Sequence, residues 1–382
     1  HGVRDASRFG AACIQNARAK DGDLPQSEDC LTLNVVSPDR RGHGLPVLVS
    51  IHGGAFAFGS GRYIADKDLS PIVRAGVILV SPNYRVGRMG FFAHPALTAE
   101  ACHGTGNYWL SDQIAALRWV RANIARFGGD PGRVTILGCS AGGSSVNSLM
   151  VSPQARGLFA HASAHSGGGL FNAARPLALA ERQGLAFAAR AHARTLAQLR
   201  ALSPAQVLAA DPGPPDFGAI VDRHLLPEAI APAFAAGRQA HVPYLVGSTS
   251  NEASVFGLMG FDAPVLKARF GIDIEAFRPA YGPLSEAELL RRVQTDFLFT
   301  AAAQALAGFA SRRAPAFAYY YDHADEGESG APHCADMPLT FGLTPPSGRD
   351  AATTAVLQAA LVNFIRAGSP HGPGVPDWPQ VR

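Results

Sequence analysis

Two dipeptides in this chain contain residue types that could carry out acyl transfer, namely Cys139-Ser140 and His333-Cys334. A serine hydroxyl is a poor nucleophile at neutral pH, so Ser140 needs a base within hydrogen-bond reach and a carboxylate that orients the base. Each dipeptide also has a cysteine directly beside its candidate catalytic side chain. If Ser140 and His333 meet in the fold, the two sulfurs must lie close together as well.

The candidate nucleophile lies in the segment Gly138-Cys139-Ser140-Ala141-Gly142, which directly follows the apolar run 134–137. Small residues continue after it, as expected for a closely packed helix. Glycines on both sides allow a strand and a helix to approach each other while the serine stays accessible at a tight turn. This context predicts that Ser140 is a nucleophile on a strand-turn-helix element.

A second glycine-containing segment, His52-Gly53-Gly54-Ala55-Phe56, follows the apolar run 47–51. Small residues leave backbone N–H groups accessible, and acyl transfer needs such donors for the oxyanion of its tetrahedral intermediate. We expect Gly54, Ala55 and Ala141 to be these donors, the last because it follows the nucleophile. The histidine that opens the segment is expected to be a structural residue beneath the loop rather than a base.

The elements that would position these residues alternate between apolar, β-rich runs and helical segments. This alternation predicts an α/β fold with a mostly parallel central sheet, flanked by helices on both faces. We expect one domain over residues 1–382, with cap helices at about 170–235 and a loop at Pro212–Pro215. Strands are predicted at 31–37, 47–51, 77–80, 134–137, 244–247 and 316–321, and helices at 111–127, capped by Ser111, at 285–313 and at 351–367.

These residues resemble the type B carboxylesterase, or cholinesterase-like, branch of the α/β hydrolases. The resemblance implies an α/β-hydrolase fold and a disulfide between Cys13 and Cys30. Relative to the family pattern, the sequence starts after the first edge strands and stops before the usual C-terminal helix. Matching segments occur in the family's order at Ser27–Val35, His52–Phe56, Gly106-Asn107, Asp112-Gln113, Phe127–Pro131, Gly138–Gly143, Gly247–Phe256 and His333–Gly342.

The same resemblance implies the partners of the serine. Hydrolases of this type place an acid and then a histidine after the nucleophile in chain order. Glu252 matches the position of the family's acid and His333 that of its base, with Asp336 and His323 as the respective alternatives. Asp336 is expected to lie behind the histidine. Ser166 resembles a family serine that supports the site from behind, although an ordinary serine at a strand end is the alternative.

The cysteines beside the serine and the histidine depart from the type B pattern. The family usually has glutamate where this chain has Cys139, which argues against a preference for cationic, choline-like esters. The two dipeptides resemble the motif of the tannase and feruloyl esterase family, in which the corresponding cysteines are bonded. A bond between Cys139 and Cys334 requires Cα atoms within about 7 Å. Two buried thiols are the alternative.

Composition narrows the function classes further. The chain has 382 residues, 47% of them apolar, and a formal net charge of only +3, which gives no basis for a nucleic-acid partner. No stretch reaches the roughly 18 apolar residues of a membrane span. The five cysteines lack metal-ligand spacing and leave Cys102 as the candidate unpaired thiol. The two expected disulfides favour a secreted or periplasmic protein.

Taken together, the sequence predicts a serine carboxylic-ester hydrolase that works through an acyl-enzyme on a small-molecule ester, without a metal or other cofactor. An acyltransferase or amidase could use the same residues. A non-catalytic cholinesterase-like interaction module is a third possibility, but it would be expected to have lost part of the triad. Phe56, Phe58 and Trp109 are candidates for the substrate pocket, with core packing as the alternative. The sequence leaves the natural ester and the oligomeric state open.

Overall fold

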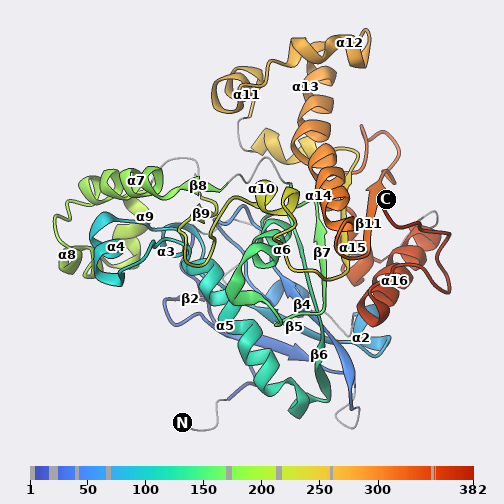
Figure 1. Cartoon of the computed structure of the whole chain (residues 1–382), viewed down its shortest axis with the longest axis horizontal. Coiled ribbons are helices and arrows are strands. Elements are labelled where there is room, and N and C mark those ends of the chain that lie inside the picture. Colours follow the sequence, from blue (N-terminus) through green and yellow to red (C-terminus); the bar gives the residue numbers. More distant parts are fainter. Residues whose placement is uncertain are drawn as a thin grey trace.

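A seven-stranded sheet forms the centre of the computed structural model (Figure 1). Every neighbouring pair is parallel except the last, β5 with β3, which is antiparallel. The predicted α/β fold with a mostly parallel sheet is therefore confirmed. The structure describes residues 5–16, 25–38, 43–65, 70–168, 174–211, 217–258, 261–345, 348 and 350–382. The strands, in spatial order, are β11 (Ala316–Tyr321), β10 (Tyr244–Thr249), β7 (His161–His165), β6 (Gly129–Cys139), β4 (Leu45–Ile51), β5 (Ile78–Pro82) and β3 (Leu33–Val36).

Six of these strands coincide with the apolar runs that predicted them, whereas β7 was not predicted. Its sequence, His161-Ala-Ser-Ala-His165, contains no β-branched residue, so it lacks the usual composition of a strand. β7 nevertheless lies between β6 and β10 and pairs with both in parallel. Burial on both faces of the sheet, rather than intrinsic preference, therefore decides its conformation. Two further short pairs are β1 (Ala12–Cys13) with β2 (Gln26–Ser27) and β8 (Arg175–Pro176) with β9 (Ile220–Val221).

Helices cover both faces of the sheet, and the alternation of side chains along each strand separates two apolar layers. Val47 and Val49 of β4 belong to the larger core with α5, α6, α10 and α14, whereas Leu48 between them faces α2, α15 and α16. The helices are α1 (Arg62–Ala65), α2 (Pro71–Arg74), α3 (Gly87–Gly90), α4 (Pro95–Ala101), α5 (Tyr108–Asn123), α6 (Ala141–Val151), α7 (Leu177–Arg190), α8 (Leu196–Arg200), α9 (Pro204–Ala209), α10 (Ile230–Ala235), α11 (Ala263–Phe270), α12 (Arg278–Tyr281), α13 (Glu286–Thr295), α14 (Ala301–Ser311), α15 (Asp336–Phe341) and α16 (Asp350–Ala367).

The predicted helix at 111–127 begins one turn earlier than expected. Asn107, not Ser111, is the residue before the first turn of α5, so the assignment of Ser111 as the cap is wrong. Ser111 lies inside the helix. Tyr108, Trp109 and Leu110 extend the apolar periodicity toward the N-terminus, and Trp109 and Leu110 are fully buried. Core packing of these side chains therefore places the start of the helix before the serine.

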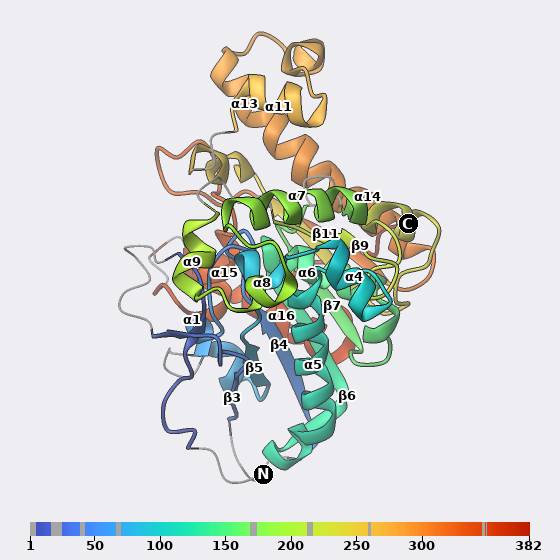
Figure 2. The ribbon, with the colours of Figure 1, turned by 90° about the vertical axis from the view of Figure 1, so that its left-hand side faces the viewer.

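Two groups of helices project from the sheet and its covering helices (Figures 1 and 2). The first contains α7, α8 and α9, which lie within the predicted cap and beside α3 and α4. The second contains α11, α12 and α13, which we call the upper lobe; a π-helical turn at Asp296–Thr300 joins it to α14. The loop predicted at Pro212–Pro215 lies outside the described residues. The assignment of residues 1–382 to a single domain stays a prediction.

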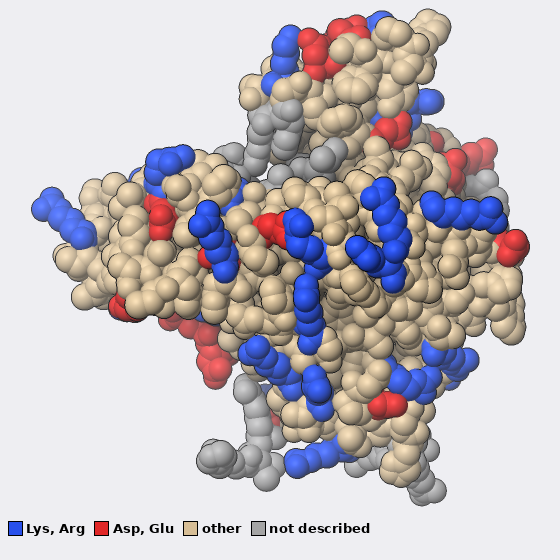
Figure 3. Space-filling view, in the orientation of Figure 1, with Lys and Arg blue, Asp and Glu red and all other residues tan. Residues whose placement is uncertain are grey.

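Charged side chains on the face seen in Figure 3 are spread out, with uncharged atoms between most of them. The space-filling view shows Lys and Arg distributed over the lower body, the cap and the upper lobe. No helix in the described part of the chain is both long and apolar enough to cross a membrane.

An ion pair between Arg85 and Asp112 joins the segment after β5 to α5. Asp112 is buried and accepts hydrogen bonds from Arg85 N at 3.0 Å, Nε at 2.8 Å and Nη2 at 2.7 Å. We predict that Asp112→Asn lowers the free energy of unfolding by about 2 kcal/mol, less than for a fully buried pair because 34% of the Arg85 side chain is exposed. Glu100→Gln, which breaks the exposed pair with Arg200, is the control in thermal denaturation. Equal effects of the two substitutions would contradict this prediction.

Candidate active site

The candidate catalytic residues Ser140, Glu252 and His333 follow three parallel strands. Ser140 comes directly after β6, Glu252 three residues after β10, and His333 in the segment between β11 and α15. Because parallel strands present their carboxyl ends at the same edge of a sheet, all three residues are brought to one edge. Open α/β sheets bind their ligands at this edge.

Ser140 occupies a strained turn between β6 and α6. Its backbone has φ 60° and ψ −125°, a conformation unusual for a residue with a side chain. Its N–H donates to the carbonyl of His165 at 3.0 Å, which ties the turn to the end of β7. A methyl group added at Gly138 would lie 2.4 Å from the carbonyl carbon of Gly142, and one at Gly142 would lie 2.2 Å from the carbonyl oxygen of Ile51. Glycine is therefore required on both sides of the serine.

Glu252 and His333 form a hydrogen-bonded pair through Oε2 and Nδ1. The Glu252 side chain is 0% exposed and that of His333 is 11% exposed. The other carboxylate oxygen accepts the N–H of Thr249 at 2.8 Å, which fixes the orientation of the acid. When Nδ1–H donates to the carboxylate, Nε2 is the ring nitrogen left to accept a proton. Nε2 is buried and has no hydrogen-bond partner among the described residues.

The loops that carry the acid and the histidine are also joined by three hydrogen bonds from backbone N–H groups. Asn251 N–H donates to the carbonyl of Ala331 at 2.9 Å, and Ala331 N–H donates to Ser250 Oγ at 2.8 Å. His333 N–H donates to Ser254 Oγ at 2.9 Å. These bonds hold the two loops side by side, independently of the Glu252–His333 side-chain contact.

Both expected disulfides are present in the structure. Cys139 and Cys334 are bonded, with their Cα atoms 6.2 Å apart, and so connect the serine turn to the histidine loop. Cys13 and Cys30 are bonded as well, with a Cα separation of 4.9 Å. All five cysteines lie in the described part of the chain, where Cys102 is a free, exposed thiol as expected.

The loop after β4 lies against the serine turn. A methyl group added at Gly53 would lie 3.4 Å from Ser140 Cβ, so the two backbones are close. Gly54 and Ala55 both have positive φ, 110° and 52°. Within the described residues, neither of their N–H groups donates to another protein group. Ala141, the first residue of α6, has an N–H with no acceptor inside its own helix.

His52 lies beneath this loop as a packed, neutral ring. It stacks on Tyr84 with ring centroids 4.1 Å apart, and Nδ1 contacts the carbonyl of Gly53 at 2.9 Å. Burial lowers the pKa of His52 to about 4, which the hydrogen bond to Gly53 opposes only partly. These contacts agree with its expected structural position rather than with a role as base.

The alternative acid and base residues are both engaged elsewhere. His323 Nε2 contacts Asp350 Oδ1 at 2.6 Å. Asp336 Oδ2 accepts from His165 Nδ1 and from Tyr319 Oη, both at 2.8 Å. Burial would raise the pKa of Asp336, but the bonds from His165 and Tyr319 outweigh it and hold the pKa below its usual value.

This buried cluster of His165, Tyr319 and Asp336 was not predicted as a unit. It includes Ser163, whose Oγ contacts His165 Nε2 at 2.8 Å. The carbonyl of His165 accepts the N–H of Ser140, so the cluster supports the end of β7 directly behind the serine turn. The sequence signal for this cluster is weak, because β7, which carries Ser163 and His165, lacks the composition typical of a strand. Asp336 therefore lies behind the site, in contact with His165 rather than with His333.

Of the remaining candidates, Ser166, Phe56 and Trp109 are buried. Ser166 is buried with φ 45°, and its Oγ has no hydrogen-bond partner among the described residues. Phe56 and Trp109 are buried against each other, with ring centroids 4.9 Å apart. Both therefore pack in the core rather than line an open pocket, whereas Phe58 is only partly buried. In the described part of the chain, no group of three His, Cys, Asp or Glu side chains is placed to hold a metal ion.

Known proteins resemble this chain over nearly its full length. A family model described as the carboxylesterase family matches residues 1–280 and 282–382. The fumonisin B1 esterase of Sphingopyxis macrogoltabida is 34% identical over 99% of this chain and 76% of its own. The para-nitrobenzyl esterase of Bacillus subtilis (strain 168) is 33% identical over 99% of this chain and 82% of its own. A solved PNB esterase structure is 32% identical, with a TM-score of 0.85 over 98% of this chain and 82% of that one.

The conformation of the loop after β4 generates a prediction. A methyl group added at Gly54, where φ is 110°, would lie 2.0 Å from the carbonyl oxygen of Phe58, so the loop must move. If Gly54 and Ala55 donate to the oxyanion, Gly54→Ala lowers kcat for ester hydrolysis by about 100-fold or more. Gly218→Ala is the matched control, since a methyl group there meets no atom within 4 Å. Steady-state kinetics with unchanged kcat in Gly54→Ala would contradict the assignment.

Proposed function

The chain belongs to the carboxylesterase family and is a carboxylic ester hydrolase, and we propose that Ser140, His333 and Glu252 are its nucleophile, base and acid. The observation that carries this assignment is the Glu252–His333 hydrogen bond, formed at the same sheet edge as the strained serine turn. Because this hydrogen bond uses Nδ1, the other ring nitrogen, Nε2, is free to accept a proton.

In the first half of the proposed reaction, His333 Nε2 takes the proton of Ser140 Oγ as that oxygen attacks the ester carbonyl carbon. The resulting imidazolium is stabilised by the Glu252 carboxylate, which is already held by Thr249 N–H at 2.8 Å. The N–H groups of Gly54, Ala55 and Ala141 stabilise the negative oxygen of the tetrahedral intermediate. Collapse of this intermediate breaks the ester C–O bond, and His333 returns the proton to the departing alcohol.

In the second half, water replaces the alcohol. His333 Nε2 takes a proton from water, the hydroxyl oxygen attacks the acyl carbon, and a second tetrahedral intermediate forms at the same donors. Its collapse releases the carboxylic acid and returns the proton to Ser140 Oγ. The cycle consumes one water and needs no cofactor.

We infer that the substrates are small-molecule carboxylic esters. The names of two relatives, fumonisin B1 esterase and para-nitrobenzyl esterase, refer to different esters and do not select one ester for this chain. Two disulfides are compatible with an extracellular or periplasmic protein. We propose that the protein acts in such an oxidising compartment.

A panel of alkyl, aryl and hydroxycinnamoyl esters tests the proposed triad. Ser140→Ala should lower kcat by about a million-fold and Glu252→Gln by about 10⁴-fold, because the acid also sets the histidine tautomer. His323→Gln should retain activity, since His323 is paired with Asp350. Turnover that is unchanged in Ser140→Ala would contradict the mechanism.

Product analysis with added alcohol or amine acceptors separates hydrolysis from acyl transfer.

The two disulfides supply a second, internally controlled test. We expect Cys139→Ala with Cys334→Ala to lower kcat, because the bond joins the serine turn to the histidine loop. Removal of this bond should also cost about 5 kcal/mol of stability in the chain-entropy model, against about 3 for the Cys13–Cys30 pair. Cys13→Ala with Cys30→Ala should therefore lower the melting temperature but leave kcat near that of the wild type. Equal kcat in the two double variants would show that the bond does not position the base.

A further inference from the structure

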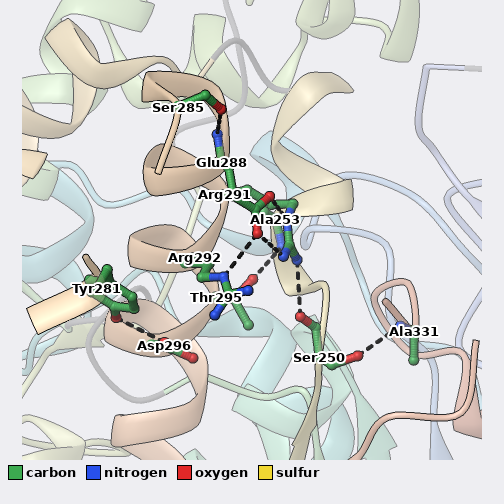
Figure 4. Close-up of polar contacts among 10 residues, drawn as sticks. All are labelled: Ser250, Ala253, Tyr281, Ser285, Glu288, Arg291, Arg292, Thr295, Asp296 and Ala331. Atoms are coloured by element: carbon green, nitrogen blue, oxygen red, sulfur yellow. Dashed lines mark hydrogen bonds and ion pairs between the residues drawn. The ribbon is translucent and has the colours of Figure 1, made fainter. Parts of the chain in front are cut away.

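One side of the α13–α14 helix contacts the loops that carry the acid and the histidine. Arg291, Thr295 and Phe299 recur at intervals of four residues along this helix. Each of them touches a different residue of the two loops (Figure 4 shows the contacts of the first two). One contact lies before Glu252 in the sequence, one lies after it, and one is with the ring of His333. None of them involves a carboxylate oxygen of Glu252.

Arg291 holds the backbone just before the acid. Its Nη1 donates to the carbonyl of Ser250 at 3.3 Å (Figure 4). The guanidinium is itself fixed by Glu288, which accepts from Nε at 2.7 Å and from Nη2 at 2.6 Å. Ser250 Oγ in turn accepts the N–H of Ala331 in the histidine loop. One arginine therefore reaches the point at which the two loops are joined.

Hydrogen bonds from Arg291, and more weakly from Arg292, lower the pKa of Glu288 to about 2 despite partial burial. Arg291 and Glu288 therefore stay oppositely charged over the range in which a histidine base can work. The bidentate geometry restricts the arginine to one orientation, which a single point charge would not do. The contact with Ser250 is thus preorganised.

Thr295 holds the backbone just after the acid. Its Oγ1 accepts the N–H of Ala253 at 3.2 Å, and the threonine is almost fully buried. Ser250 and Ala253 lie on either side of Glu252 in the sequence, so the helix fixes both flanks of a residue whose side chain is 0% exposed. Movement of the helix would therefore move the acid.

Phe299 packs on the base itself. Its ring lies edge-on to the imidazole of His333, with ring centroids 5.4 Å apart and an interplanar angle of 66°. One turn of an α-helix holds about 3.6 residues, so side chains spaced four residues apart do not stay aligned but rotate gradually around the helix axis. The wider π-helical turn at Asp296–Thr300 reduces this drift before Phe299. The hydroxyl of Tyr281 donates to Asp296 at 2.8 Å and links α12 of the upper lobe to this turn.

We propose that Arg291, Thr295 and Phe299 are positioning residues that hold Glu252 and His333 in their reactive geometry and couple them to the upper lobe. This inference rests on the proposed triad. Loss of these contacts would leave the ester-binding surface in place but misalign the acid and the base. Such a change lowers kcat more than it raises KM.

Paired substitutions test the proposal. Arg291→Met and Thr295→Val should each lower kcat by about tenfold or more, because small misplacements of a catalytic group have large kinetic costs. Thr295→Ser keeps the hydroxyl that accepts the Ala253 N–H, and it should restore most of the activity. Arg292→Met is the matched control, since Arg292 also bonds Glu288, at 2.9 Å, but is 49% exposed and has no hydrogen bond to the acid loop among the described residues.

Steady-state kinetics and melting temperatures should be measured for all four variants, with the concentration of active sites determined by titration. A double-mutant cycle adds the specific readout. In a Glu252→Gln background, Thr295→Val should have little further effect on kcat if Thr295 acts through the acid. The inference would be overturned if Thr295→Val lowered kcat by the same factor in the Glu252→Gln background as in the wild type. It would also be overturned if neither Arg291→Met nor Thr295→Val changed kcat. Full activity of Glu252→Gln alone would instead overturn the proposed triad.

Discussion

Close contact between backbones at the serine turn is the constraint on which the rest of the site depends. Ser140 can hold its strained conformation because Gly138 and Gly142 let β6, α6 and β4 approach within distances that any side chain would prevent. The same approach brings the loop after β4 beside the serine. One packing requirement therefore fixes both the candidate nucleophile and the candidate oxyanion donors, and the hydrogen bond to His165 extends it to β7.

The histidine, in contrast to the serine, is not positioned by a strand and helix that adjoin it. His333 lies in a connection between β11 and α15 that contains no regular strand or long helix of its own, so its position must come from neighbouring elements. Ser254 Oγ of the acid loop accepts the N–H of His333, the serine turn supplies a disulfide, and the π-helical turn before α14 supplies the ring of Phe299. Several independent attachments can fix a loop that a single contact would leave mobile.

Elements whose local composition agrees with the fold were predicted from the sequence. Elements and contacts that depend on tertiary packing were not. Apolar, β-branched runs predicted six strands, and the fold class is confirmed, but β7 has the composition of a loop. Ser111 is a good capping residue by type, yet burial of Trp109 extends α5 past it toward the N-terminus. Arg291, Thr295 and Phe299 could not be distinguished from any other helix face, because their partners in the two loops are 34 to 42 residues away in the sequence.

The separation of the paired cysteines has a consequence for how the protein is made. Cys13 and Cys30 are 17 residues apart and can bond as soon as the N-terminal region has been synthesised, whereas Cys139 must wait for a partner 195 residues later. During that interval the growing chain presents Cys139 together with Cys102, which ends as an exposed thiol. In an oxidising compartment a disulfide oxidant can join these two thiols, and attack by the Cys334 thiolate on Cys139 can later release Cys102 as a thiolate. The order in which the cysteines emerge therefore leaves Cys139 without its native partner until Cys334 has been synthesised.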